Sequence, residues 1–212
     1  MSQYKYTKDG IADSIDRELS WRKKELKVFK DTIPTQSSPK QDALLRCSIP
    51  IIYAHWEGFV KRSCELYLEY VSNRNDILKN LKPQFIAIAL RNAIQAQEIK
   101  KISERTKAVQ YIIDNLESST KIQTKNVIAT KSNLKYEVFE DICHLLCIRT
   151  DEISKKKELI DELVKTRNTI AHGNYDKISY KLFCEFYDDV IILLETLRTE
   201  IENAVAMDNH KR

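Results

Sequence analysis

Residues 158–175, ELIDELVKTRNTIAHGNY, predict an amphipathic helix that ends at a glycine. At about 100° per residue, Arg167 projects near the middle of the apolar face of this helix. An unpaired buried guanidinium is energetically costly, so we expect Arg167 to meet a carboxylate, a phosphate or a subunit boundary. The apolar residues recur at three- and four-residue steps and are Ile160, Leu163, Val164, Ile170 and Ala171.

The composition of the whole chain favours long helices. Its 212 residues are 42% hydrophobic and 31% charged, which is enough for one substantial core. Only three glycines and four prolines are present, and a chain so poor in turn formers is most easily built from helices. We therefore predict an all-α fold, an up-and-down helical bundle with a long C-terminal helix.

The expected helices are separated by short breaks, and Gly173 is expected to end the helix that carries Arg167. Ser132 and Asn133 are both candidate N-caps for the helix that starts near residue 134. No repeat and no domain boundary is evident, which predicts one domain over residues 1–212 with a helical and loop insertion at about 75–135. Helices are predicted over residues 10–29, 42–73, 83 toward 102, 107–116, 134–147, about 154–172 and 178–205.

Charge and cysteine content narrow the class of protein. The net charge of +4 and pI near 8.7 permit an anionic partner without requiring one. The N-terminus has no apolar leader segment, and nowhere do about 18 uncharged apolar residues run together, so we expect a cytoplasmic protein without a membrane span. His144 lies between two cysteines, but a packed histidine fits better than zinc. Five cysteines without CxxC spacing predict reduced core thiols: Cys47, Cys64, Cys143, Cys147 and Cys184.

Residues 167–172, RNTIAH, combine an arginine, a polar residue, three free positions and a histidine, and this motif resembles that of the HEPN superfamily (higher eukaryotes and prokaryotes nucleotide-binding). Two further stretches, residues 51–71 (IIYAHWEGFVKRSCELYLEYV) and 128–142 (IATKSNLKYEVFEDI), are similar to the MAE-type branch of that superfamily, which is known from bacterial toxin and antiviral loci. The resemblance covers roughly residues 10–205 and implies a HEPN-like bundle.

The resemblance implies a metal-independent endoribonuclease without a cofactor that acts as a homodimer on an RNA substrate. It also implies an antitoxin or a defence-system protein as partner. Some HEPN toxins carry, two residues after the motif histidine, a tyrosine that a partner nucleotidyltransferase modifies. Asn174 occupies that position here, so we do not expect this modification, nor do we assign it to Tyr175.

The chemistry of RNA cleavage by its own 2′-hydroxyl assigns roles to the motif. The reaction needs a base, an acid on the opposite side and cationic donors around the phosphorus, and two copies of the motif would supply all of them. We assign Arg167 to phosphate binding, His172 to proton transfer and Asn168 to orientation of the histidine or phosphate. The alternative is a catalytically inert HEPN dimer that binds a nucleotide, RNA or a partner protein.

Residues outside the motif give weaker indications. Glu57 lies at the edge of an apolar face, where it either pairs with Arg167 and aims it or is solvated. His55 is expected at the surface. The stretch 118–136 has no acidic residue and either tracks an RNA backbone or forms a solvated loop. Its lysines are Lys121, Lys125, Lys131 and Lys135. Four aromatic residues are expected in the core and not as base-stacking residues, namely Trp56, Phe59, Tyr67 and Tyr70.

Overall fold

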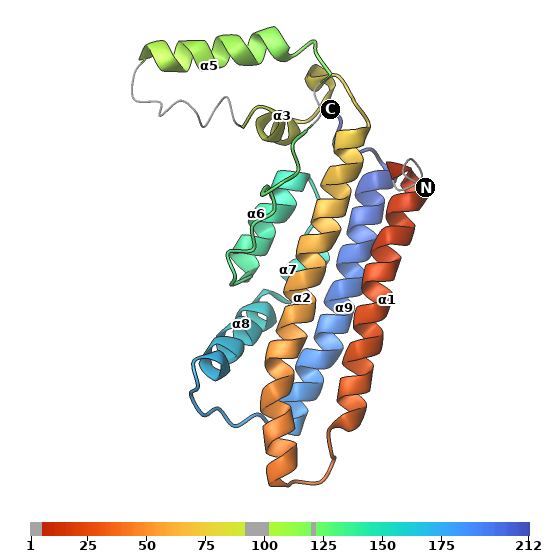
Figure 1. Cartoon of the computed structure of the whole chain (residues 1–212), viewed down its shortest axis with the longest axis vertical. Helices are drawn as coiled ribbons and strands as arrows, with labels where there is room; N and C mark the ends of the chain where they lie inside the picture. Colours follow the sequence, from red (N-terminus) through yellow and green to blue (C-terminus); the bar gives the residue numbers. More distant parts are fainter. Residues whose placement is uncertain (1–5, 92–101, 120–121) are drawn as a thin grey trace.

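Three long helices lie side by side and form the body of the molecule (Figure 1). Helix α1 (Lys8–Thr32) makes two contacts with helix α9 (Tyr180–Ala206). They place the start of α1 near the end of α9, and the end of α1 near the start of α9. The Lys8 ammonium donates to the Ala206 carbonyl at 3.0 Å, and Lys30 pairs with Asp188 at 3.2 Å. Helices α1 and α9 therefore run antiparallel to each other. The computed structural model describes residues 6–91, 102–119 and 122–212. The long helices are α1 (Lys8–Thr32), α2 (Pro39–Asn73) and α9 (Tyr180–Ala206).

Helix α2 is the central element because other helices cover it on several sides. It begins at a defined cap, where the Ser38 hydroxyl accepts a hydrogen bond from the Gln41 N–H at 3.1 Å and Pro39 occupies the first turn. It packs mainly against α1, α9 and two of the shorter helices. The predicted core aromatics are confirmed, since all four are fully buried: Trp56, Phe59, Tyr67 and Tyr70.

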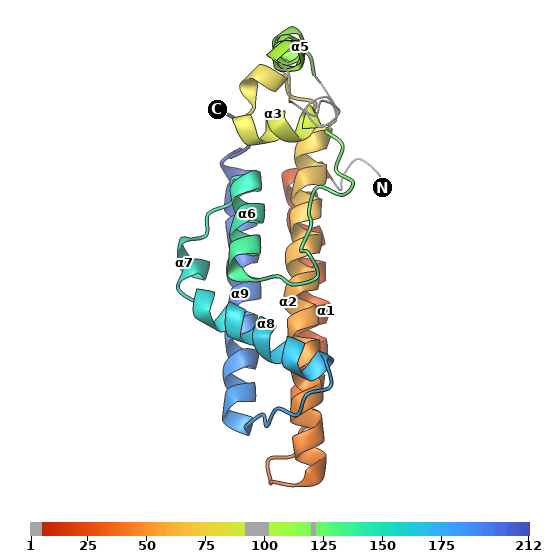
Figure 2. The ribbon, with the colours of Figure 1, turned by 90° about the vertical axis from the view of Figure 1, so that its left-hand side faces the viewer.

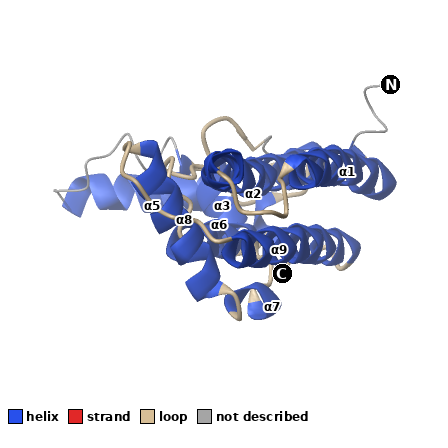
Figure 3. Ribbon diagram, turned by 90° about the horizontal axis from the view of Figure 1, so that it is seen from below, coloured by secondary structure: helices blue, strands red, loops and turns tan. Residues whose placement is uncertain are grey.

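Helices α6 (Tyr136–Leu146) and α8 (Lys157–Ala171) lie on the side of α2 opposite α1 (Figures 1 and 2). Helices α3 (Pro83–Ala89) and α5 (Ile102–Asn115) lie at one end of the bundle, and the short α7 (Asp151–Ser154) packs against α9. The helix with the motif, α8, packs against α2 and runs obliquely to it, whereas α5 lies at the far end of the molecule (Figures 1 and 2). Over the described part of the chain, Figure 3 shows helices and loops without a strand.

The all-α prediction is confirmed, and most predicted helix limits lie within a few residues of the observed ones. Pro83 starts a helix as expected, but α3 ends at Ala89 instead of continuing toward Ile102, and residues 92–101 lie outside the described part. The caps proposed for α6 were wrong. Its N-cap position is Lys135, with no side-chain hydrogen bond.

All five cysteines are free, as predicted, and Cys64 and Cys143 are buried in the core. The predicted core position was wrong for Cys47, which is exposed, whereas Cys147 and Cys184 are half-buried. Burial raises the pKa of the Cys64 thiol to about 12, so this thiol stays protonated. His144, expected to be packed beside Cys143, is exposed instead, because adjacent residues on α6 point to different sides of the helix. None of the helices described in the structure is long and apolar enough to span a membrane.

Candidate active site at the end of helix α8

The motif occupies the last two turns of α8. The N–H of Gly173 donates to the Ile170 carbonyl at 3.0 Å, and that of Asn174 donates to the Thr169 carbonyl at 3.1 Å. Gly173 has a φ of +79°, the left-handed conformation that glycine adopts most easily, so the predicted helix end is confirmed. The buried face of α8 includes Ile160, Leu163 and Val164, whereas Ala171 in the last turn is exposed.

Arg167 is half-buried, and no carboxylate in the described part of the chain forms an ion pair with it. Its guanidinium lies over the Tyr53 ring, 4.0 Å from the ring centroid, and its Nη2 donates to the Ser132 carbonyl at 2.9 Å. Its Nε is buried and has no hydrogen-bond partner in the structure. Within the described residues no ion pair joins Arg167 to Glu57, so the two side chains are not paired in the structure, and a supporting role of Glu57 stays a prediction. The guanidinium contacts the Tyr53 ring and the Ser132 carbonyl instead.

Tyr53 holds the site together from α2. Its hydroxyl accepts a hydrogen bond from the Leu134 N–H at 2.7 Å while its ring lies beneath Arg167. Burial, the largest effect, raises the pKa of Tyr53, and the half-buried Glu57 carboxylate raises it further; the Leu134 N–H and the Arg167 cation oppose them. The Tyr53 pKa is raised on balance, so the phenol remains neutral at physiological pH and offers an uncharged support to the cation.

The loop before α6, which includes Ser132 and Asn133, makes a second hydrogen bond to the motif. The Asn168 amide donates to Asn133 Oδ1 at 3.1 Å, beside the bond between Arg167 and Ser132. Ser132 and Asn133 thus bind α8 instead of capping α6, and the first N–H of α6 is satisfied by Asp161 of α8. This bond joins the Tyr136 N–H to Asp161 Oδ1 at 2.9 Å. Asn168 therefore orients the loop in this protomer.

His172 lies at the C-cap of α8, with its N–H bonded to the Asn168 carbonyl at 3.0 Å. Its side chain is exposed and makes no hydrogen bond or ion pair with any residue that the structure describes. The imidazole is therefore free to contact a molecule outside the protomer. Such a position suits a proton-transfer group that must reach a substrate.

Two of the four lysines in the stretch 118–136 lie near the motif. Lys131 and Lys135 are exposed and flank the loop residues that bond to Arg167 and Asn168. Lys125 is also exposed, and its carbonyl accepts a hydrogen bond from Arg91 at 2.6 Å. Lys121 lies outside the described residues. Contact between these lysines and RNA remains a prediction.

Sequence reasoning missed two residues on α2. Tyr53 belongs to the apolar stripe of that helix. The stripe predicts that Tyr53 is buried, but it does not predict that its hydroxyl bonds to Leu134 or that its ring contacts Arg167. Arg46 lies on the same face as Tyr53, seven residues earlier, and its Cζ is 5.1 Å from the centroid of the Tyr175 ring. Its Nε is buried without a partner, like that of Arg167. The seven-residue spacing from Tyr53 was the available signal.

His55 was wrongly expected at the surface. It is buried, its ring centroid is 5.4 Å from that of Trp21, and its Nε2 lies 3.6 Å from the Glu25 carboxylate on α1. Burial lowers the pKa of His55, although Glu25 opposes the shift. Because His55 faces α1, it cannot serve as a second base beside the motif.

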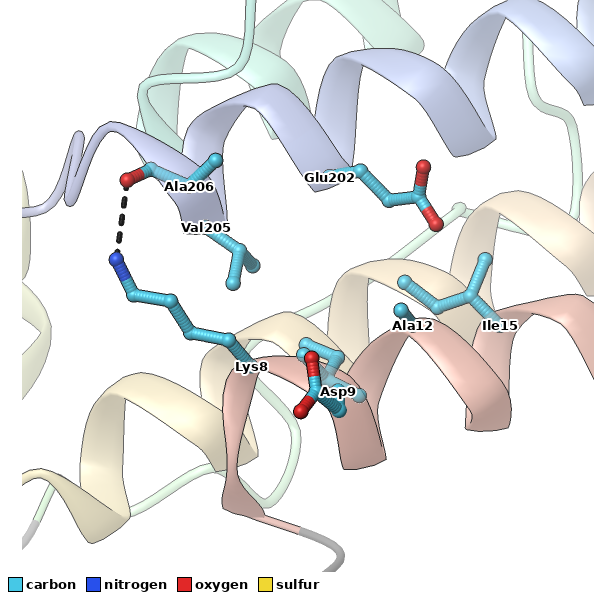
Figure 4. A pocket seen from close by; sticks show the side chains of 8 residues that line it. Lys8, Asp9, Ala12, Ile15, Glu202, Val205 and Ala206 are labelled. Atoms are coloured by element: carbon cyan, nitrogen blue, oxygen red, sulfur yellow. Dashed lines mark hydrogen bonds between the residues drawn. The ribbon is translucent and has the colours of Figure 1, made fainter.

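A cavity of about 290 Å³ lies away from the motif, between the first turns of α1 and the last turns of α9 (Figure 4). Lys8 at its edge bonds to the Ala206 carbonyl, and Glu202 pairs with Arg198 at 2.7 Å, so these charged groups already have partners. No motif residue lines the cavity. In the described part of the chain, no group of three or more histidine, cysteine or acidic residues is arranged to hold a metal ion.

Comparison with known proteins identifies the family. The RiboL-PSP-HEPN family model matches residues 17–203, which covers α2, most of α1 and of α9, and the whole motif. No curated protein matches the chain, and no solved structure matches it. The similarity to the MAE-type branch stays a prediction, because the match is to the family as a whole. The chain belongs to the RiboL-PSP-HEPN family and thereby to the HEPN superfamily.

Proposed function

We propose that the protein is a metal-independent endoribonuclease of a bacterial toxin–antitoxin or antiviral defence system. It cleaves RNA by attack of the 2′-hydroxyl, in an active site to which two protomers each contribute the end of α8. The membership of the HEPN superfamily supports a nuclease or nucleotide-binding role, and the motif residues favour the nuclease.

The contacts of Arg167 are the observation that carries the proposal. The ring of Tyr53 and the carbonyl of Ser132 fix the guanidinium without neutralising it, because neither partner carries a negative charge. A guanidinium has five N–H donors, and one of them is bonded here. A phosphate provides both the charge and the acceptor oxygens that the remaining Nη donors lack.

The reaction that we propose is an in-line displacement at phosphorus. A base takes the proton of the 2′-hydroxyl, the 2′-oxygen forms a bond to phosphorus, and the bond from phosphorus to the 5′-oxygen breaks. An acid on the opposite side gives a proton to the departing 5′-oxygen. The products are a 2′,3′-cyclic phosphate and a 5′-hydroxyl. Arg167 stabilises the charge that gathers on the phosphoryl oxygens.

The need for both a base and an acid supports a site shared between two protomers. One motif supplies one histidine, His172, and its exposed position leaves it available to a second copy of the chain. Two motifs facing each other supply two histidines and two arginines. One neutral imidazole then accepts a proton while a charged one donates.

The test is cleavage of mixed cellular RNA by the purified protein in the presence of EDTA. We expect the wild type to produce fragments with cyclic phosphate ends, and His172→Ala to reduce the rate about 10²–10⁴-fold. Arg167→Ala should reduce it by a similar order. His144→Ala, which removes another exposed histidine, is the matched control and should cleave normally. Circular dichroism verifies that each variant is folded.

Two results would reject the proposal. Equal cleavage by the wild type and both motif variants would place the activity elsewhere. A wild type that cleaves no RNA, yet binds nucleotide, RNA or a protein partner, would favour the inert dimer. Within cells, expression of the wild type should arrest growth, and either motif substitution should relieve the arrest.

A further inference from the structure

We propose that Tyr175 and Arg46 form a second subsite, which stacks a nucleobase of single-stranded RNA beside the scissile phosphate. This inference rests on the proposed function and adds a substrate contact outside the motif. Neither residue belongs to the RNTIAH motif, and neither was assigned to RNA binding from the sequence.

Arg46 resembles Arg167 in its surroundings. Its guanidinium faces a tyrosine ring, its Nε is buried without a hydrogen-bond partner, and it makes no ion pair with any residue that the structure describes. An arginine without an ion-pair partner has an uncompensated positive charge, and the N–H donors of its planar guanidinium are available to a ligand. Arg46 lies on the same face of α2 as Tyr53, so this second cation lies on the same side of the molecule as the motif.

Tyr175 offers an open aromatic surface next to this cation. The residue is 72% exposed although one side of its ring faces Arg46, so the other face is accessible to solvent. Its position is set by the end of α8, where the bonds of Gly173 and Asn174 turn the chain toward α2. An exposed aromatic ring backed by a guanidinium is suited to stacking of a base, which every nucleotide presents.

The distances from the motif fit one strand of RNA. Tyr175 comes three positions after His172 in the chain, which limits the distance between their Cα atoms to about 10 Å. On α2, Arg46 lies about 10 Å along the helix axis from Tyr53, on which Arg167 rests. A strand whose phosphate binds Arg167 therefore reaches the ring of Tyr175 with a neighbouring nucleotide. Stacking on that ring is independent of base identity, so this subsite should favour single strands without selecting a sequence.

The test measures binding and not cleavage. The probe is a single-stranded oligonucleotide with 2′-O-methyl groups throughout, which prevent attack, and with 2-aminopurine, whose fluorescence falls when it stacks. We expect Tyr175→Ala to lower the affinity about tenfold and to remove the quenching, and Tyr175→Phe to preserve both. Tyr111→Ala is the matched control, because Tyr111 is also exposed but lies on α5 at the other end of the molecule (Figure 1).

Arg46 is tested through the salt dependence of the same binding. Arg46→Ala should reduce the slope of log affinity against log salt by about 0.7, the value for one contact with a single strand. Arg46→Lys should preserve the slope but weaken the quenching, because the ammonium cannot support the ring as a planar guanidinium does.

Each alternative outcome decides the question. If Tyr175→Ala binds the probe as tightly as the wild type, the subsite is wrong while the proposed nuclease stands. If that variant sediments as a monomer where the wild type is a dimer, Tyr175 is a subunit contact and the subsite is again wrong. If the wild type neither binds the probe nor cleaves RNA, the proposed function fails together with the subsite.

Discussion

Tyr53 performs two tasks whose requirements differ. Its ring face supports the Arg167 cation, and its hydroxyl satisfies the buried N–H of Leu134. The first task needs only an aromatic face, because the attraction comes from the ring quadrupole. The second needs the oxygen, since a buried N–H without an acceptor is destabilising. Substitutions that remove one property at a time can therefore separate them.

The paired variants Tyr53→Phe and Tyr53→Leu test this division. Tyr53→Phe should lower the free energy of unfolding by about 1–3 kcal/mol, measured in urea, because the Leu134 N–H loses its acceptor. It should retain most of the cleavage rate. Tyr53→Leu should in addition lower the rate about tenfold, since the cation–π contact is lost.

A spectroscopic measurement keeps this prediction independent of enzyme activity. The ring current of Tyr53 should shift the NMR signal of the Arg167 Nε–H in the wild type and in Tyr53→Phe. The shift should disappear in Tyr53→Leu. Identical signals in all three proteins would show that the ring does not position the guanidinium, whatever the cleavage rates are.

The start of α6 depends on a hydrogen bond to α8. Lys135 at the N-cap of α6 gives no side-chain bond, and Asp161 from the middle of α8 bonds the first N–H instead. The start of α6, the loop before it and the motif helix are consequently one unit. A change at Asp161 acts on α6 although it lies on another helix.

Asp161→Ala should lower the free energy of unfolding by about 1 kcal/mol, the usual cost of losing a cap. Hydrogen exchange should become faster at the N-terminal amides of α6 and remain unchanged in α9. Asp161→Asn preserves an acceptor oxygen and is the matched control. If the alanine and asparagine variants unfold at the same urea concentration as the wild type, the bond contributes nothing to stability.

Element boundaries were predictable where local chemistry sets them, as at Pro83 and Gly173. The same logic failed at Ser132 and Asn133, because their partners lie on α8 and no local pattern records such a contact. His55 was misplaced for a related reason. Other helices cover α2 on several sides. A residue away from its main apolar stripe, such as His55, is therefore buried against α1 and not exposed to solvent.

At the scale of the molecule, the long helices support the RNTIAH motif but do not carry it. α1, α2 and α9 form the bundle, and α8 rests on the side of α2 away from α1 with its motif end exposed (Figure 1). Among the long helices, α2 contacts the motif through Tyr53, and it carries Arg46 beside Tyr175. The arrangement leaves the motif open for a second protomer to approach, which a buried site would prevent.

Random pairing of wild-type and His172→Ala protomers tests whether two chains share one active site. If each site needs both histidines, only wild-type pairs cleave, and activity falls with the square of the wild-type fraction. An equal mixture should then retain about one quarter of the activity, because a mixed pair lacks either its acid or its base. Independent sites would instead retain about one half. The protomers must be refolded together so that they pair freely, and mixing with His144→Ala in the same way controls for loss of protein. A linear decline with the wild-type fraction would contradict the shared site and leave His172 acting alone in each chain.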